Sequence, residues 1–298
     1  MVSYLEKFKL FMKIQKNAAA LTIKGYERDI AQFFRFLDSQ GYSVQSLNYP
    51  ILRHFLALLK EQHYSRSTIA RKISAVRAFL RYLKKEGVLS GNSWEIVSTP
   101  KKDKRLPVFL YPDEVLELLE APEKGSVLGL RDRAILEILY GSGVRVSELT
   151  GLNLADVDME DGFLRILGKG TKERIVPIGK YARQAVAVYL RNGRPELEKK
   201  CEPERQEDAL FLNKLGQRLS DRSVRRILSK YSARIGLGSQ VSPHALRHSF
   251  ASHMLNAGAD LRIVQDLLGH ASISTTQIYT HITKDELKRT YLKTHPRA

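Results

Sequence analysis

The sequence predicts a mainly α protein of two domains, with one small antiparallel β-hairpin in the second domain. Apolar residues recur at helical spacing over most of the chain, and only one stretch holds short β-prone runs. The length of 298 residues exceeds the usual size of one domain. An aperiodic stretch rich in Pro, Gly, Lys and Arg interrupts the pattern, so we expect a helical N-terminal domain over 1–88, a linker over 89–108 and a second domain over 109–298.

Four helices are expected in the first domain. Apolar residues at helical spacing mark the first within residues 1–16 and the third from about Pro50. The second spans 22–40, and Gly41 follows it where a left-handed C-terminal cap belongs. The fourth spans Ser65–Glu86, and Gly87 ends it.

The fourth helix is strongly basic. Its apolar stripe is accompanied by seven Lys and Arg residues, and there is no Asp or Glu between Ser65 and Lys85. A helix that is only solvated normally mixes both signs of charge, so this composition favours a helix that faces phosphates.

In the second domain, a helix starts near Tyr111–Asp113 and another spans Arg131–Tyr140, which we expect to break at Gly141–Gly143. The β-prone runs Phe163–Leu167 and Arg174–Ile178 are joined by a glycine-rich turn and form the predicted hairpin. Helices resume from Tyr181, with a polar loop over residues 195–208.

The last third of the chain predicts three further helices. Ser242 caps the first, with proline at its first turn, and Asp260 caps the second, which runs to Leu268. Gly269 supplies a left-handed turn that directs His270 away from the helix end. The third helix opens at Ser272 or Ser274 and contains Tyr279.

Composition limits the partners and the compartment. With 49 Lys and Arg against 32 Asp and Glu, the net charge is +17, which favours a nucleic acid as partner. Cys201 is the only cysteine, which excludes an intrachain disulfide and a cysteine metal site and fits the cytoplasm. The N-terminus has no signal-peptide pattern, and no apolar run is long enough to span a membrane. Neither a signal peptide nor a membrane span is therefore expected.

Several residue types needed to hold and attack a phosphodiester are present. His244 and Arg247 share one face at a helix N-terminus, and Arg145 follows a Gly-Ser-Gly break. An arginine fork can hold two phosphate oxygens at once. These three side chains are candidates to bind the phosphate.

The remaining groups provide a nucleophile and proton transfer. Tyr279 offers a phenol for covalent attack, Lys169 at the hairpin tip is a candidate proton donor, and His270 is placed to assist the phosphate or the nucleophile. Each of these residues alone is more often structural, and the hypothesis depends on the combination.

Two other sites are not supported. His244, His248 and His253 lack the glutamate of a His-Glu-x-x-His zinc site. The run Gly162–Thr171 has the wrong spacing for a nucleotide-binding loop and carries Gly170 where Ser or Thr belongs.

Taken in order, six residues resemble the active site of the tyrosine recombinases, or phage integrase family. They are Arg145, Lys169, His244, Arg247, His270 and Tyr279. The runs Gly143–Leu149, Gly168–Arg174 and His244–His281 are most similar to the Xer branch, and the likeness covers nearly the whole chain.

The resemblance implies a role for each residue. Arg145, Arg247 and His244 would hold the scissile phosphate, and Lys169 would protonate the leaving 5′-oxygen. His270 would support the phosphate and the nucleophile's proton, and Tyr279 would form a 3′-phosphotyrosyl link that needs neither ATP nor a metal. No cofactor is expected. Glu148, on the same helical face as Arg145, is a candidate to orient it.

The family fold is a C-shaped clamp, with a four-helix SAM-like core-binding domain on one DNA face and a mostly helical catalytic domain with a small antiparallel sheet on the other. On the basic helix, Arg71, Lys72 and Arg77 would then contact DNA. Residues after Tyr279, with Leu287 and Tyr291 at helical spacing, resemble a tail that docks into a neighbouring subunit.

The resemblance implies a site-specific recombinase that resolves chromosome or plasmid dimers at cell division. It would act as a homo- or hetero-tetramer on double-stranded DNA, through a Holliday junction, with a septal DNA translocase as a further candidate partner. The alternatives are an integrase of a mobile element, a type IB topoisomerase-like enzyme and a DNA-binding protein without catalysis. The chain has no room for the extra N-terminal domain of many integrases, and the tail disfavours a monomeric topoisomerase.

Overall fold

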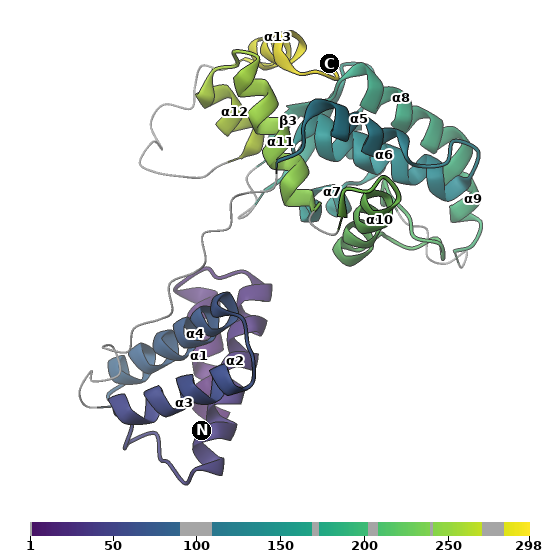
Figure 1. The fold of residues 1–298 in the computed structure, drawn as a ribbon. Helices are drawn as coiled ribbons and strands as arrows, with labels where there is room; N and C mark the ends of the chain where they lie inside the picture. Colours follow the sequence, from purple (N-terminus) through teal and green to yellow (C-terminus); the bar gives the residue numbers. More distant parts are fainter. Residues whose placement is uncertain (1, 90–108, 169–172, 202–207, 239–240, 270–282) are drawn as a thin grey trace. The chain divides into compact units, whose positions relative to one another are not determined.

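The computed structural model describes residues 2–89, 109–168, 173–201, 208–238, 241–269 and 283–298 (Figure 1). The chain forms two compact units, Met1–Arg105 and Leu106–Ala298. Both described units are mainly helical and the second also contains a small antiparallel sheet, so the predicted fold class is confirmed. The predicted linker lies almost wholly outside the described residues, and the clamp-like placement of the two units stays a prediction.

The first unit packs its helices around an aromatic core. Ser65, where the basic helix was predicted to start, accepts a hydrogen bond from the Thr68 backbone and caps that helix, and Asn48 caps the helix before it. Phe33, Phe55 and Phe79 are completely buried. The helices of this unit are α1 (Val2–Ile14), α2 (Ala20–Ser39), α3 (Tyr49–Glu61) and α4 (Arg66–Lys85).

The second unit places its helices around α6, which is buried along most of its length. The described helices are α5 (Pro112–Glu120), α6 (Val127–Ser142), α7 (Val146–Gly151), the 3-10 turn η2 (Leu154–Asp156), α8 (Lys180–Val188), the π-helical turn η3 (Tyr189–Gly193), α9 (Arg194–Glu198), α10 (Asp221–Arg234), α11 (Pro243–Asn256), α12 (Leu261–Leu268) and α13 (Lys284–Thr294).

The sheet has the strand order β1-β2-β3 and is antiparallel throughout. Its strands are β1 (Val157–Asp158), β2 (Phe163–Leu167) and β3 (Glu173–Pro177). β2 matches the prediction and β3 begins one residue earlier than predicted, with Phe163 opposite Pro177 and Leu167 opposite Glu173. β1 was not predicted, because two residues are too short to show a period.

Some predicted boundaries are wrong, and α6 begins at Val127 rather than at Arg131. α6 continues through Gly141 and Ser142 and ends only at Gly143, which adopts φ 60°. A Cβ on Gly141 would lie 3.6 Å from the Ala182 side chain, so this glycine sits at a contact between α6 and α8. The predicted loop over 195–208 also begins with α9, where Arg194 is buried and donates to the Ala209 carbonyl.

The C-terminal segment packs on the unit that carries it. α13 contacts β3, α11 and α12 (Figure 1). Tyr291 is 1 % exposed, its hydroxyl accepts a hydrogen bond from the Gly179 backbone, and its ring stacks on His295. Arg297 forms a buried ion pair with Glu137. Docking of this segment into a neighbouring subunit stays a prediction.

Candidate functional site: a cluster of three arginines

The end of α6 determines where Arg145 lies. Gly143 adopts the left-handed conformation, and a Cβ there would approach the Phe250 ring to 2.5 Å, so both the backbone angle and the packing require glycine. Two residues later Arg145 is the N-cap of α7, and its backbone N–H donates to Glu148 Oε2 at 2.7 Å. The Gly-Val-Arg sequence therefore ends one helix and begins the next with the arginine between them.

Arg247 enters the same place from α11. Ser242 caps this helix, as predicted, by accepting from the Ala245 backbone. The Arg247 guanidinium is buried and donates to the Gly143 carbonyl at 2.5 Å and to the Leu268 carbonyl. Burial, followed by the positive charge of Arg145, lowers the pKa of Arg247 to about 10, which keeps it protonated at neutral pH. His244, one turn earlier on α11, is exposed.

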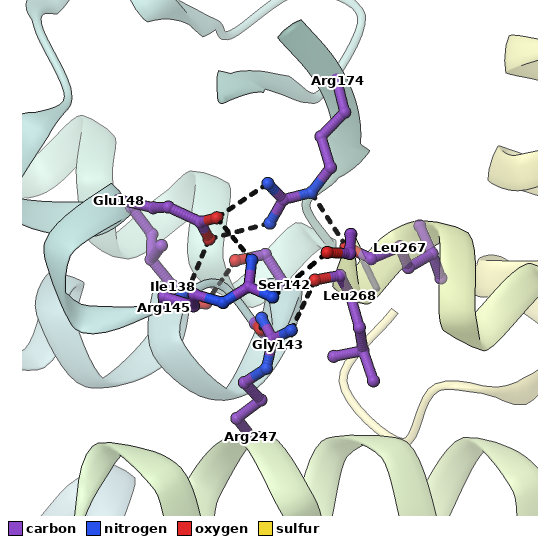
Figure 2. A network of polar contacts seen from close by, with 10 residues as sticks. Ile138, Ser142, Gly143, Arg145, Glu148, Arg174, Arg247, Leu267 and Leu268 are labelled. Carbon is purple, nitrogen blue, oxygen red and sulfur yellow. Dashed lines mark hydrogen bonds and ion pairs between the residues drawn. The ribbon is translucent and has the colours of Figure 1, made fainter. Parts of the chain in front are cut away.

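Glu148 is the carboxylate at the centre of the cluster (Figure 2). Its Oε1 accepts from Arg145 Nη1 at 2.9 Å and from Arg174 Nη1 at 2.8 Å. Its Oε2 accepts from the Arg145 backbone and from Arg174 Nη2 at 2.8 Å. Although burial favours the neutral acid, the hydrogen bonds from Arg174 and Arg145 hold the pKa of Glu148 below its usual range. The carboxylate is therefore ionised and orients both guanidinium groups.

Three successive backbone carbonyls at the end of α12 each accept from a different arginine. Arg174 Nε donates to Leu267 and Arg247 Nη2 to Leu268 (Figure 2). Arg145 Nη2 donates to Gly269 at 3.1 Å. The last carbonyls of a helix lack partners within the helix and carry the negative end of its dipole. The end of α12 therefore holds three cations with carbonyls that carry no net charge.

The cluster has the electrostatics of an anion site. Two guanidinium groups, those of Arg145 and Arg174, pair with one carboxylate, a third from Arg247 binds the neighbouring carbonyls, and the Arg145 side chain remains 41 % exposed. Within the described residues, its Nη1 and Nη2 contacts use two of the five N–H donors of an arginine. Guanidinium forks bind phosphate oxygens well, so the arrangement can neutralise the charge that develops on a reacting phosphodiester.

The other three predicted site residues, Lys169, His270 and Tyr279, lie outside the described residues. The described segments that adjoin two of them, Lys169 and His270, nevertheless reach the cluster. Lys169 belongs to the turn between β2 and β3, the strand that carries Arg174, and His270 follows Gly269 directly. Gly269 has the predicted left-handed conformation, with φ 63°.

The expected DNA contacts on α4 differ in exposure. Arg71 is half exposed on its side chain and pairs with Asp29, and Arg77 is partly exposed. Lys72 does not fit a DNA-facing role: it is 7 % exposed, and its ammonium binds Asp29 Oδ1 at 3.1 Å and Gln32 Oε1 at 2.5 Å. The correction has a simple cause, because position 72 lies one turn from Ile69 and Val76 on the buried stripe.

Arg174 is the member of the cluster that sequence reasoning missed. It appeared only as the first residue of the predicted second strand and as the last residue of the run Gly168–Arg174, with no role of its own. The sequence did contain one signal for it, which is Glu148. A carboxylate expected beside Arg145 would cancel the charge of that arginine, so a site that binds an anion requires a second cation to pair with the same carboxylate.

Neither a metal centre nor a membrane span emerges from the described residues. No group of three or more His, Cys, Asp and Glu side chains among them is placed to hold a metal ion. Of the histidines considered for zinc, His253 is buried, with Nδ1 2.9 Å from the Tyr140 hydroxyl. Within the same residues, every helix is too short or too polar to cross a bilayer.

The sequence matches two family models and is similar to named recombinases over nearly its whole length. The model of the phage integrase family matches residues 108–286, and that of the phage integrase N-terminal SAM-like domain matches residues 5–87. The tyrosine recombinase XerC of Pelotomaculum thermopropionicum is 44 % identical over 100 % of this chain and 99 % of its own length. That of Halalkalibacterium halodurans is 47 % identical over 99 % of this chain and 98 % of its own.

Solved structures agree in fold. XerH site-specific recombinase bound to its difH substrate is 26 % identical, with a TM-score of 0.69, over 97 % of this chain and 83 % of that one. The Tn1549 transposon integrase in complex with transposon end DNA has a TM-score of 0.72 at 20 % identity, covering 96 % and 97 % of the two chains.

Proposed function

Because the chain belongs to the phage integrase family and is a tyrosine recombinase, a site-specific DNA recombinase, we propose that it cleaves and rejoins strands through Tyr279. The observation that supports this most directly is the cluster of Arg145, Arg174 and Arg247 around Glu148. It provides a cationic site beside the segment that continues to His270 and Tyr279.

In the proposed reaction, the Tyr279 hydroxyl oxygen attacks the scissile phosphorus. A P–O bond to the tyrosine forms, and the P–O bond to the 5′-oxygen breaks. Arg145, Arg247 and His244 hold the non-bridging oxygens, which carry the growing charge. Lys169 gives a proton to the leaving 5′-oxygen.

The tyrosine's proton passes to a base, for which His270 is the candidate. The phosphodiester energy is kept in the 3′-phosphotyrosyl bond, so a 5′-hydroxyl from another strand reverses the reaction. The chemistry balances without ATP, and no step in it calls for a metal ion.

We further propose that the biological reaction resolves chromosome or plasmid dimers. This rests on relatives named XerC that match over nearly their full length. The partner would be a double-stranded recombination site bound by four subunits, with α4 on the DNA and the segment after Tyr279 joining neighbours. A septal DNA translocase is the further candidate partner.

The test uses a recombination site nicked near the scissile phosphate, so that the released 5′ fragment diffuses away and the covalent complex accumulates. Wild type is expected to give a protein–DNA adduct that survives denaturing electrophoresis. Tyr279→Phe should give none, while Tyr49→Phe, which alters an exposed tyrosine of the first unit, should react like wild type. An adduct with Tyr279→Phe would overturn the assignment.

A further inference from the structure

We propose that Arg174, on β3, is a positioning residue for the phosphate-binding arginines, which keeps Arg145 oriented without neutralising it. The inference rests on the proposed function, since it concerns how the same site reads the phosphate. Arg174 is mostly buried, with 17 % of its side chain exposed, and every nitrogen of its guanidinium has an acceptor among the described residues.

The first step concerns charge. Glu148 is 6 % exposed on its side chain, and a buried carboxylate must be paired. If Arg145 were its only partner, the two charges would cancel and the orienting acid would remove the charge that the phosphate requires. Arg174 supplies the second cation, so Glu148 can fix Arg145 while the cluster with Arg247 keeps an excess of two positive charges.

The second step concerns geometry. Arg174 binds Glu148 with a fork of two parallel hydrogen bonds, both 2.8 Å long, and places its Nε against the Leu267 carbonyl. A fork fixes the plane of both groups, which a single ammonium cannot do. The orientation of Glu148, and through it that of Arg145, therefore depends on the planar group of Arg174.

The third step concerns what Arg174 connects. Its backbone lies in the hairpin that carries Lys169, its fork reaches Glu148 on α7, which in turn binds Arg145, and its Nε reaches the end of α12. Gly269 packs on the guanidinium so closely that a Cβ would lie 3.0 Å from Arg174 Cζ. One side chain therefore joins the three segments that bring Lys169, Arg145 and His270 to the proposed reaction.

The experiment compares Arg174→Gln and Arg174→Lys with Arg165→Gln, a control on the neighbouring strand whose side chain is 53 % exposed and pairs with Asp156. Adduct formation is followed in a single turnover on saturating nicked DNA. We expect Arg174→Gln to slow it about 100-fold, the scale of a misplaced reacting group. Arg174→Lys should recover about tenfold of that loss, because it restores charge but not the fork. The control should match wild type.

A second substrate separates positioning from folding. Replacing the scissile phosphate by a methylphosphonate removes the charge that the arginines read. The rate of Arg174→Gln relative to wild type should then rise to within about threefold, since the oriented charge no longer matters. A variant that is merely unstable would show the same relative loss on both substrates, and that result would overturn the proposal.

A binding arm works without cleavage. In full-length Tyr279→Phe protein, we compare the affinity for DNA with an unmodified scissile phosphate with the affinity for DNA with the methylphosphonate. The ratio of the two affinities reports how strongly the arginine cluster attracts the phosphate charge. Adding Arg174→Gln should bring this ratio toward one. An unchanged ratio would refute the role of Arg174, whereas failure of wild type to form any adduct would refute the proposed function instead.

Discussion

Gly143 permits the sharpest prediction of stability. The residue has φ 60° and a Cβ there would lie 2.5 Å from Phe250 Cδ1, a ring that is completely buried. Alanine in the left-handed conformation costs about 1–2 kcal/mol. Displacing a packed ring adds about 1–3 kcal/mol of overpacking. Gly143→Ala should therefore destabilise the second unit by about 2–5 kcal/mol, the sum of the two effects.

The matched control is Gly236→Ala in the same unit. Gly236 also has a positive φ, 77°, but a Cβ there would have nothing within 4 Å. This substitution should cost only the backbone term of about 1–2 kcal/mol. The difference between the two variants isolates the contact with Phe250, and adding Phe250→Leu to Gly143→Ala should recover part of it.

Scanning calorimetry of the full chain, which has two units, measures the transition of the second unit in each variant. If the second unit of Gly143→Ala has the same melting temperature as that of Gly236→Ala, then Gly143 does not pack closely against Phe250 and the reasoning is wrong. The nicked-site assay gives a second reading, because the Gly143 carbonyl accepts from Arg247 and Arg145 lies two residues on. Gly143→Ala should lose adduct formation even below its melting temperature, while Gly236→Ala should keep it.

Three further predictions follow from the same contacts. Burial lowers the pKa of His295 to about 3, so the unfolded chain binds its proton first as pH falls below about 6.5. The free energy of unfolding should be greatest above about pH 6.5 and fall by up to about 1.4 kcal/mol per pH unit between there and about pH 3. His295→Asn should flatten this slope in urea titrations. Lys72→Ala should destabilise the first unit by about 3 kcal/mol, because it leaves Asp29 with Arg71 alone, whereas exposed Lys84→Ala should be neutral by calorimetry. Adduct formation should continue in excess EDTA, and its loss there would refute metal-independent cleavage.

Local signals in the sequence predicted the backbone around the site well. Ser242 caps α11 by accepting from the backbone N–H of Ala245, three residues on, and Gly269 takes the left-handed turn. These features depend on a few neighbouring residues and on hydrogen bonds that the chain must satisfy locally. The hairpin strands followed for the same reason, since two β-prone runs joined by a glycine-rich turn are visible in the sequence.

Errors arose where packing between distant segments decides. Gly141 looks like a helix breaker, but contact with α8 keeps it helical. Lys72 is a different case: its place beside Ile69 and Val76 on the apolar stripe already indicated burial, and only its ion pair with Asp29, 43 residues away, depends on a distant segment. Arg174 gained no role because its partner Glu148 lies 26 residues earlier and the Leu267 carbonyl 93 residues later. No periodic pattern contains such pairings.

The choice of acceptors explains how the site stays cationic when three arginines are packed together. The positive charges of the three arginines repel one another. Additional carboxylates would relieve this repulsion, but they would also cancel the positive charge that the phosphate requires. Carbonyls of Gly143, Leu267, Leu268 and Gly269 instead hold the guanidinium groups by their dipoles, and one carboxylate suffices to orient two of them. Because these donors are fixed before any phosphate arrives, little reorganisation remains to be done when charge develops in the reaction. The carbonyls of Leu267 and Leu268 belong to the last turn of α12, and that of Gly269 follows them directly. Any shift of this helix end would therefore move the three arginines, together with the chain that leads to residue 270.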